Sequence, residues 1–152
     1  MADVSESIEV AASPLEVYEQ VSELSRMAEW SPECTGVRWS TGGVPGVGSR
    51  FIGLNRSGVF RWFTQGEVVE AVPGERFSFR ITFGPVPVAL WTYEFAATGS
   101  GSGSGCTVTE SWTDRRPAAL KAVFARMFGD RTKINRYGIH QTLGKLKASL
   151  ES

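Results

Sequence analysis

The sequence has few of the features that mark membrane, metal-binding or disulfide-stabilised proteins. No apolar run approaches the ~20 residues that a membrane-spanning helix needs, and the alternating N-terminus is unlike a signal peptide. The two cysteines, Cys34 and Cys106, are too few for a disulfide framework and lack metal-ligand spacing. The glycine-rich run at 99–105 contains no lysine and opens no helix, so it is not a phosphate loop. We therefore expect a cytoplasmic protein without metal or cofactor.

Net charge is also missing, because 16 Lys+Arg are balanced by 16 Asp+Glu. A neutral chain gains no bulk attraction to nucleic acid or anionic lipid, so we expect no nucleic-acid partner and no membrane span. Strand arginines near Phe63 resemble the ingredients of an RNA platform, but cross-strand pairing with Glu67 and Glu94 explains them more simply. The single histidine, His140, falls on the wet side of its predicted helix, which leaves a Ser-His-Asp triad without support.

The chain of 152 residues suits one domain spanning residues 1–152. Alternation predicts a half-buried strand over Val4–Val10. The sequence from Ser13 to Glu16 is a capping box with proline at the first helical position, and it predicts a short helix. A second short helix is expected from near Ser25 to Trp30, because the residue before Pro32 disfavours the α region.

From Val37 to Asp114 the patterns are all those of strands. The breaks between them are short and rich in Gly, Pro or Ser, which favours antiparallel hairpins. The predicted strands are Val37–Ser40, Ser49–Asn55, Phe60–Val72, Arg76–Phe83, Val88–Ala97 and Cys106–Asp114. The chain closes with a long helix from Pro117, which Gly129 breaks or kinks. These elements predict an α+β fold with a seven-stranded antiparallel sheet.

Alternate positions of the predicted strands differ in chemistry, so one sheet face should be dry and the other wet. The dry face collects most of the large rings and two gaps, at Gly53 and Gly66. Three polar residues, Asn55, Thr64 and Glu110, interrupt it. We consider two interpretations: the rings fill a solid core, or the helix and the sheet enclose an apolar cavity with a few polar groups, as ligand sites do.

Several stretches resemble the START-like superfamily, also called SRPBCC, and its polyketide cyclase/dehydrase-type branch. They are Ser13–Tyr18, Met27–Pro32, Gly48–Phe51, Glu67–Phe77, Trp91–Phe95 and Val108–Trp112. The resemblance covers nearly the whole chain. It implies a helix-grip fold, in which the sheet wraps around a long C-terminal helix over a deep hydrophobic cavity. The superfamily includes lipid carriers, hormone receptors, aromatases/cyclases and chaperone activators, so it does not imply one fixed catalytic set.

The inward residues give a candidate ligand-binding set. It consists of Trp30, Phe51, Asn55, Trp62, Phe79, Trp91, Tyr93, Glu110, Trp112, Arg131 and Asn135. Glu110 and Tyr93 are the best candidates for proton transfer, since a carboxyl in apolar surroundings has a raised pKa. Alternatively, Glu110 is a structural group paired with Arg131 or Asn55. The resemblance places Trp30 at the cavity rim, and a lid on the core is the other interpretation.

We expect the protein to bind a small hydrophobic molecule that is aromatic, polyketide-like or lipidic, as a monomer or homodimer. One alternative is a cyclase or dehydratase, which would need two convergent proton-transfer groups. Another is a protein-interaction or chaperone-regulating module, for which Phe63 with Ile52 and Leu54 offers an apolar outer patch. If Glu110 is an ionised ligand contact, Glu110→Gln should weaken binding of a polar-headed ligand.

Overall fold

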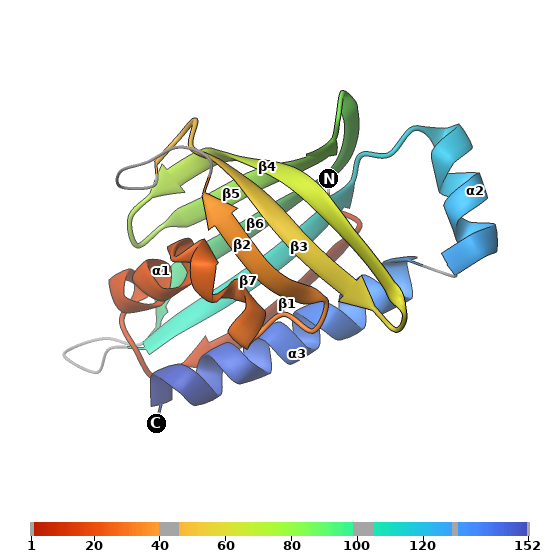
Figure 1. Ribbon diagram of the computed structural model, residues 1–152. Coiled ribbons are helices and arrows are strands. Elements are labelled where there is room, and N and C mark those ends of the chain that lie inside the picture. The colour runs from red at the N-terminus through yellow and green to blue at the C-terminus, as the bar shows by residue number, and fades with distance from the viewer. Residues whose placement is uncertain (1, 40–45, 99–104, 129–130, 152) are drawn as a thin grey trace.

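A computed structural model describes residues 2–39, 46–98, 105–128 and 131–151 of the chain. Its elements follow in the order β1 (Val4–Val10), α1 (Pro14–Ser22), the 3-10 helix η1 (Leu24–Glu29), β2 (Cys34–Trp39), β3 (Arg50–Ser57), β4 (Phe60–Val72), β5 (Arg76–Phe83), β6 (Val86–Thr98), β7 (Gly105–Asp114), α2 (Ala118–Phe128) and α3 (Arg131–Glu151). The strands form one antiparallel sheet in the order β1-β7-β6-β5-β4-β3-β2 (Figure 1). This confirms the predicted α+β architecture.

The two short helices begin and end as their local sequence dictates. At the start of α1, the Ser13 Oγ accepts a hydrogen bond from the backbone N–H of Glu16 at 3.2 Å, and the Glu16 carboxylate accepts one from the backbone N–H of Ser13 at 3.3 Å. The second short helix is the 3-10 helix η1 and ends at Glu29, three residues before Pro32.

The strand bounds agree with the sequence pattern except at the ends. β2 begins at Cys34 instead of Val37, and its register against β3 shifts between Cys34 and Gly36. Phe83 has the alternation parity of the dry-face rings Phe77 and Phe79, so the sequence pattern predicts that it points inward, and this prediction is wrong. Its side chain is 53% exposed and packs against Phe63, 5.8 Å between ring centroids, beyond a register shift between β5 and β6. The predicted loops at 42–48 and 98–105 lie largely outside the described residues.

The two helices that pack on the dry face, α1 and α3, do not cover it evenly. Tyr18 of α1 packs edge-on against Phe77 and Phe95 near one end of the sheet. α3 packs mainly along β1, at the sheet edge, with Ile139, Leu143 and Leu146 buried. The middle strands therefore face α3 across a space that neither helix fills, which is the arrangement that can leave a cavity.

The predicted single C-terminal helix is two helices in the structure. Residues 118–128 form α2 and residues 131–151 form α3, while the predicted break, Gly129, lies outside the described residues. α2 stands off from the sheet at the end opposite α1 (Figure 1). None of the helices in the described part of the chain has the length and apolar character needed to cross a bilayer.

Candidate functional site

A cavity of about 450 Å³ lies between the dry face of the sheet, the connection from η1 to β2, and α3. This volume is within the range of small-molecule sites. All but one of the candidate residues line it, namely Phe51, Asn55, Trp62, Phe79, Trp91, Tyr93, Glu110, Trp112, Arg131 and Asn135. The structure thus has the predicted cavity, and the rings do not fill the core solidly.

The walls are largely aromatic. Trp91 and Trp112, neighbours across β6 and β7, lie 6.5 Å apart between ring centroids, and Phe51 and Phe79 meet edge-on at 5.6 Å. One of the two predicted gaps is occupied: the Phe51 ring covers Gly66 so closely that a Cβ there would lie 2.1 Å from the ring. Gly53 does line the cavity. The space is therefore set by Gly53 and by the position of α3, and Gly66 serves to seat Phe51.

Trp30 is the one candidate that does not line the cavity. Its side chain is 2% exposed, and the Arg26 guanidinium lies 5.1 Å from its ring centroid. The structure thus supports the interpretation of Trp30 as a lid on the core. The sequence correctly predicted that Trp30 ends the second short helix, because it precedes Ser31-Pro32. The residues that follow it, Ser31 to Cys34, line the cavity instead.

Glu110 and Tyr93 form a buried pair in the cavity wall. They are direct cross-strand partners on β7 and β6, and the Tyr93 hydroxyl donates a hydrogen bond of 2.8 Å to Glu110 Oε2. Glu110 Oε1 is buried and has no hydrogen-bond partner among the described residues. Because burial outweighs the hydrogen bond from Tyr93, the pKa of Glu110 is raised to about 8. Burial and the neighbouring carboxyl hold the pKa of Tyr93 well above its usual value. At neutral pH both groups are therefore uncharged.

The predicted structural partners of Glu110 are wrong. Arg131, the first residue of α3, forms an ion pair with Glu33, with Nη1 3.1 Å from Oε2. Asn55 donates to the backbone oxygen of Gly53 at 3.4 Å and to Thr64 Oγ1 at 3.5 Å. Both side chains line the cavity but bind other residues instead of Glu110. The buried carboxyl of Glu110 therefore avoids an unpaired buried charge by staying protonated.

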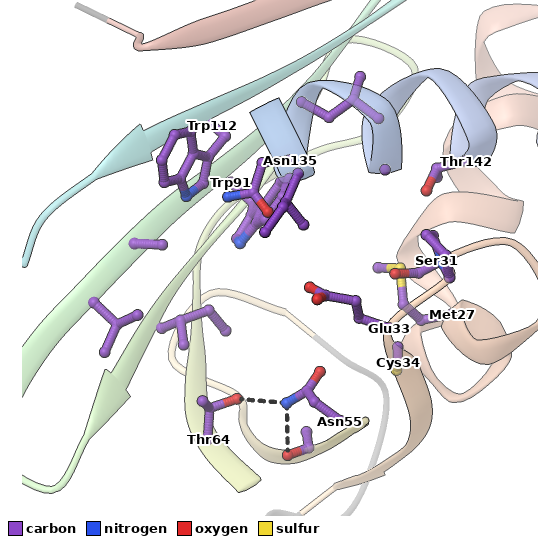
Figure 2. A pocket seen from close by; sticks show the side chains of 18 of the residues that line it. Met27, Ser31, Glu33, Cys34, Asn55, Thr64, Trp91, Trp112, Asn135 and Thr142 are labelled. Carbon is purple, nitrogen blue, oxygen red and sulfur yellow. Dashed lines mark hydrogen bonds between the residues drawn. The ribbon is translucent and has the colours of Figure 1, made fainter. Parts of the chain in front are cut away.

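The Arg131–Glu33 pair lies at the open side of the cavity. Both side chains are partly exposed, 28% and 21%, and Figure 2 shows Glu33 extending into the space that the labelled side chains surround. Ser57 and Gly58 of the β3–β4 turn and Tyr137 of α3 also line the cavity. The sequence interpretation missed Glu33, although it follows directly on the Trp30–Pro32 segment that the resemblance placed at the mouth.

Two of the strand arginines on the outer face, Arg76 and Arg80, are paired as the simpler interpretation expected. Arg80 donates to Glu67 at 3.0 Å, and Arg76 lies 3.0 Å from Glu70 and 3.5 Å from Glu94. In the described part of the chain, no three His, Cys, Asp or Glu residues gather as a metal site. The chemistry that the cavity offers is thus that of a neutral carboxyl and a phenol in an aromatic chamber.

Over residues 1–151 the chain matches the family described as "Polyketide cyclase / dehydrase and lipid transport". The chain belongs to this family. The START superfamily and polyketide cyclase structures among its matches have the same helix-grip fold. No curated protein matches it significantly.

Solved structures of this family's fold cover the chain almost completely. The Polyketide_cyc-like protein Cgl2372 of Corynebacterium glutamicum is 30% identical, with a TM-score of 0.61, and the match covers 99% of this chain and 93% of that one. A START superfamily protein of Mycobacterium smegmatis has a TM-score of 0.72 at 13% identity, covering 97% and 96%. The di-domain aromatase/cyclase StfQ of the steffimycin pathway has a TM-score of 0.69 at 16% identity, covering 97% of this chain and 50% of StfQ.

Proposed function

We propose that the protein binds a small, largely apolar molecule that carries a neutral hydrogen-bond acceptor, such as a ketone, next to Glu110. The single observation that carries this proposal is the unpartnered, buried Glu110 Oε1 in the wall of an otherwise aromatic cavity. An isolated buried polar atom costs free energy until something satisfies it, and a ligand acceptor does so. The aromatic walls supply the apolar surface that such a ligand buries.

The protonation of Glu110 decides which ligand group it prefers. Tyr93 donates to Oε2, so a protonated Glu110 has its own O–H available for a ligand oxygen. The titratable residues that face the pair include Cys34, which lines the same cavity, and Glu6, the cross-strand partner of Glu110 on β1, whose carboxylate lies 3.8 Å from His140. Below pH 8 the site therefore favours an acceptor, and above it the carboxylate favours a donor.

Because Glu110 is protonated, the expected effect of Glu110→Gln differs from the one that the sequence suggested. Glu110→Gln keeps the shape and a donor group, so it should bind a ketone like the wild type instead of more weakly. Glu110→Met removes the donor at similar volume and should weaken ketone binding about tenfold, the value of one hydrogen bond. A matched pair of probes, acetylnaphthalene and ethylnaphthalene, separates the contribution of the hydrogen bond from that of apolar burial, because only the first probe has a carbonyl.

Titration of tryptophan fluorescence follows binding, since Trp62, Trp91 and Trp112 line the cavity. We expect acetylnaphthalene to bind tighter than ethylnaphthalene at pH 6.5 and the preference to disappear above pH 8 in the wild type but not in Glu110→Gln. Native mass spectrometry of the purified protein then shows whether it retains a molecule of this class. The proposal would be refuted if the protein showed no preference for the ketone at any pH, or if Glu110→Met lost affinity for both probes equally.

Proton transfer is the second candidate function, favoured by one observation: a carboxyl with a pKa of about 8 is hydrogen-bonded to a tyrosine inside the cavity. In such a reaction the Glu110 carboxylate accepts a proton from the carbon next to the ligand carbonyl, as cyclases and dehydratases require. Deuterium exchange at the methyl group of bound acetylnaphthalene tests it. Exchange above the buffer rate that disappears in Glu110→Gln, with binding unchanged, indicates catalysis, whereas exchange at the buffer rate in the wild type leaves binding as the function.

A further inference from the structure

The chain is neutral as a whole, but its charges are separated. Residues 1–33 contain eight acidic residues and one arginine, whereas residues 114–137 contain seven arginines and lysines and two aspartates. α1, from the acidic segment, and α2, from the basic one, lie at opposite ends of the molecule (Figure 1). Overall neutrality therefore does not prevent one end from being attracted to a negatively charged surface.

α2 combines apolar and basic residues and is attached to the cavity mouth at both ends. Of its eleven residues, only Lys121 and Arg126 are charged, and Val123 is 50% exposed. Arg116 precedes the helix and Arg131 follows it, and both line the cavity. An apolar helix with basic side chains and no acidic ones is typical of segments that lie in a membrane interface.

The β3–β4 turn borders the same mouth and has the same chemistry. Ser57 and Gly58 line the cavity, and the next residue, Val59, is 91% exposed. Arg56 and Arg61 are direct cross-strand partners, and neither forms an ion pair with any residue that the structure describes. Arg56 Nε donates to the backbone oxygen of Gly58 at 3.0 Å, which holds its side chain at the turn but leaves its charge without a carboxylate partner among the described residues. Like charges on directly opposite residues destabilise a hairpin, and an external anion would relieve this repulsion.

We propose that α2 and the β3–β4 turn together form a docking surface for an anionic lipid bilayer, with the cavity mouth facing the lipid. Val59 and Val123 would enter the interface, while Arg56, Arg61, Lys121 and Arg126 contact acidic headgroups. The charge of the surface selects an anionic lipid. Exposed apolar residues at a turn tip and on a helix that stands off from the sheet match a soft interface better than a preformed protein groove. An apolar molecule could then pass between bilayer and cavity without crossing water.

Vesicle sedimentation of the full chain tests the surface without any cavity ligand, so the result is independent of the proposed function. The probes are phosphatidylcholine vesicles with and without phosphatidylserine. The wild type should bind the mixed vesicles more tightly and lose binding as salt is added. Arg56→Gln with Arg61→Gln should reduce the partition coefficient about 25-fold, since each basic residue near such a surface contributes about fivefold.

Val59→Asp should reduce vesicle binding about as strongly, and Leu15→Asp provides the matched control. Leu15 is 49% exposed on α1, at the opposite end of the molecule, so its variant should bind like the wild type. Circular dichroism and thermal unfolding verify that each variant is folded. Equal binding to vesicles without phosphatidylserine, no binding to either, or an unaffected Val59→Asp would overturn the proposal. Retention on polyglutamate beads with no vesicle binding would identify an acidic protein as the partner and overturn it equally.

Discussion

Glu110 and Glu33 line the same cavity, but their carboxyl groups differ: that of Glu110 is protonated, and that of Glu33 is paired with an arginine. Glu110 lies in the wall of the sheet, fully buried, and Tyr93 is its one hydrogen-bond partner among the residues that the structure describes. Glu33 lies at the partly exposed mouth and is paired with Arg131. Where water reaches the group, a charge pair forms at little cost, and where it does not, the carboxyl keeps its proton. The cavity thus has a neutral, hydrogen-bonding interior and a charged entrance.

The largest effect that we expect from a single substitution at neutral pH tests the aromatic wall of the interior. Gly66→Ala places a Cβ 2.1 Å from the Phe51 ring, which is itself held between Trp39 and Phe79. Because the ring cannot move without disturbing both neighbours, we expect a loss of about 2–3 kcal/mol in the free energy of unfolding, measured with urea. Gly36→Ala is the control, since its Cβ has ordinary contact at 3.8 Å with Leu54. Similar effects of the two substitutions would contradict this account of Gly66.

The second prediction concerns the pH dependence of stability. The pKa of Glu110 rises from 4.5 to about 8 on folding, so the folded state binds the proton more tightly. Its contribution to stability is complete below pH 4.5, decreases as the pH rises, and is lost once the pH passes about 8. We expect the wild type to lose a few kcal/mol over this window. In Glu110→Gln this decrease should be absent, and an identical slope in the two proteins would show that Glu110 is ionised throughout.

The sequence predicted the fold because strand alternation and short turns leave few alternatives. It also placed Glu110 and Tyr93 on the same face. Their contact could have been predicted, because pairing β6 with β7 as a hairpin brings the two residues opposite each other. Glu110 was instead assigned a partner by charge, Arg131, and this prediction was wrong. Arg131 and Glu33 are 98 positions apart, and their contact depends on how α3 crosses the mouth, which no local pattern specifies.

The third prediction separates the two members of the interior pair. Tyr93→Phe leaves Glu110 Oε2 without its donor, so the pKa of Glu110 should rise further, because the hydrogen bond from Tyr93 lowers it. We expect a stability loss of about 1–2 kcal/mol, the cost of leaving a buried polar group unsatisfied. Carbon-13 NMR of labelled glutamate follows the titration. Tyr137→Phe, at a 63% exposed position on α3, should change neither quantity. A lower pKa of Glu110 in Tyr93→Phe would contradict this description of the pair.

The smallest effect on stability is expected at the mouth. Arg131 and Glu33 are partly exposed, so a double-mutant cycle with Arg131→Gln and Glu33→Gln should give a coupling of about 0.5–1 kcal/mol that weakens with added salt. The pair nevertheless joins the start of α3 to the connection between η1 and β2, two elements on opposite sides of the opening. Its loss should therefore change the kinetics of ligand exchange more than the affinity. We expect either single variant to release acetylnaphthalene severalfold faster in stopped-flow fluorescence, with its dissociation constant nearly unchanged because association accelerates as well. An unchanged release rate would show that the ion pair does not limit passage through the mouth, and a large loss of affinity would show that Arg131 or Glu33 contacts the bound ligand directly.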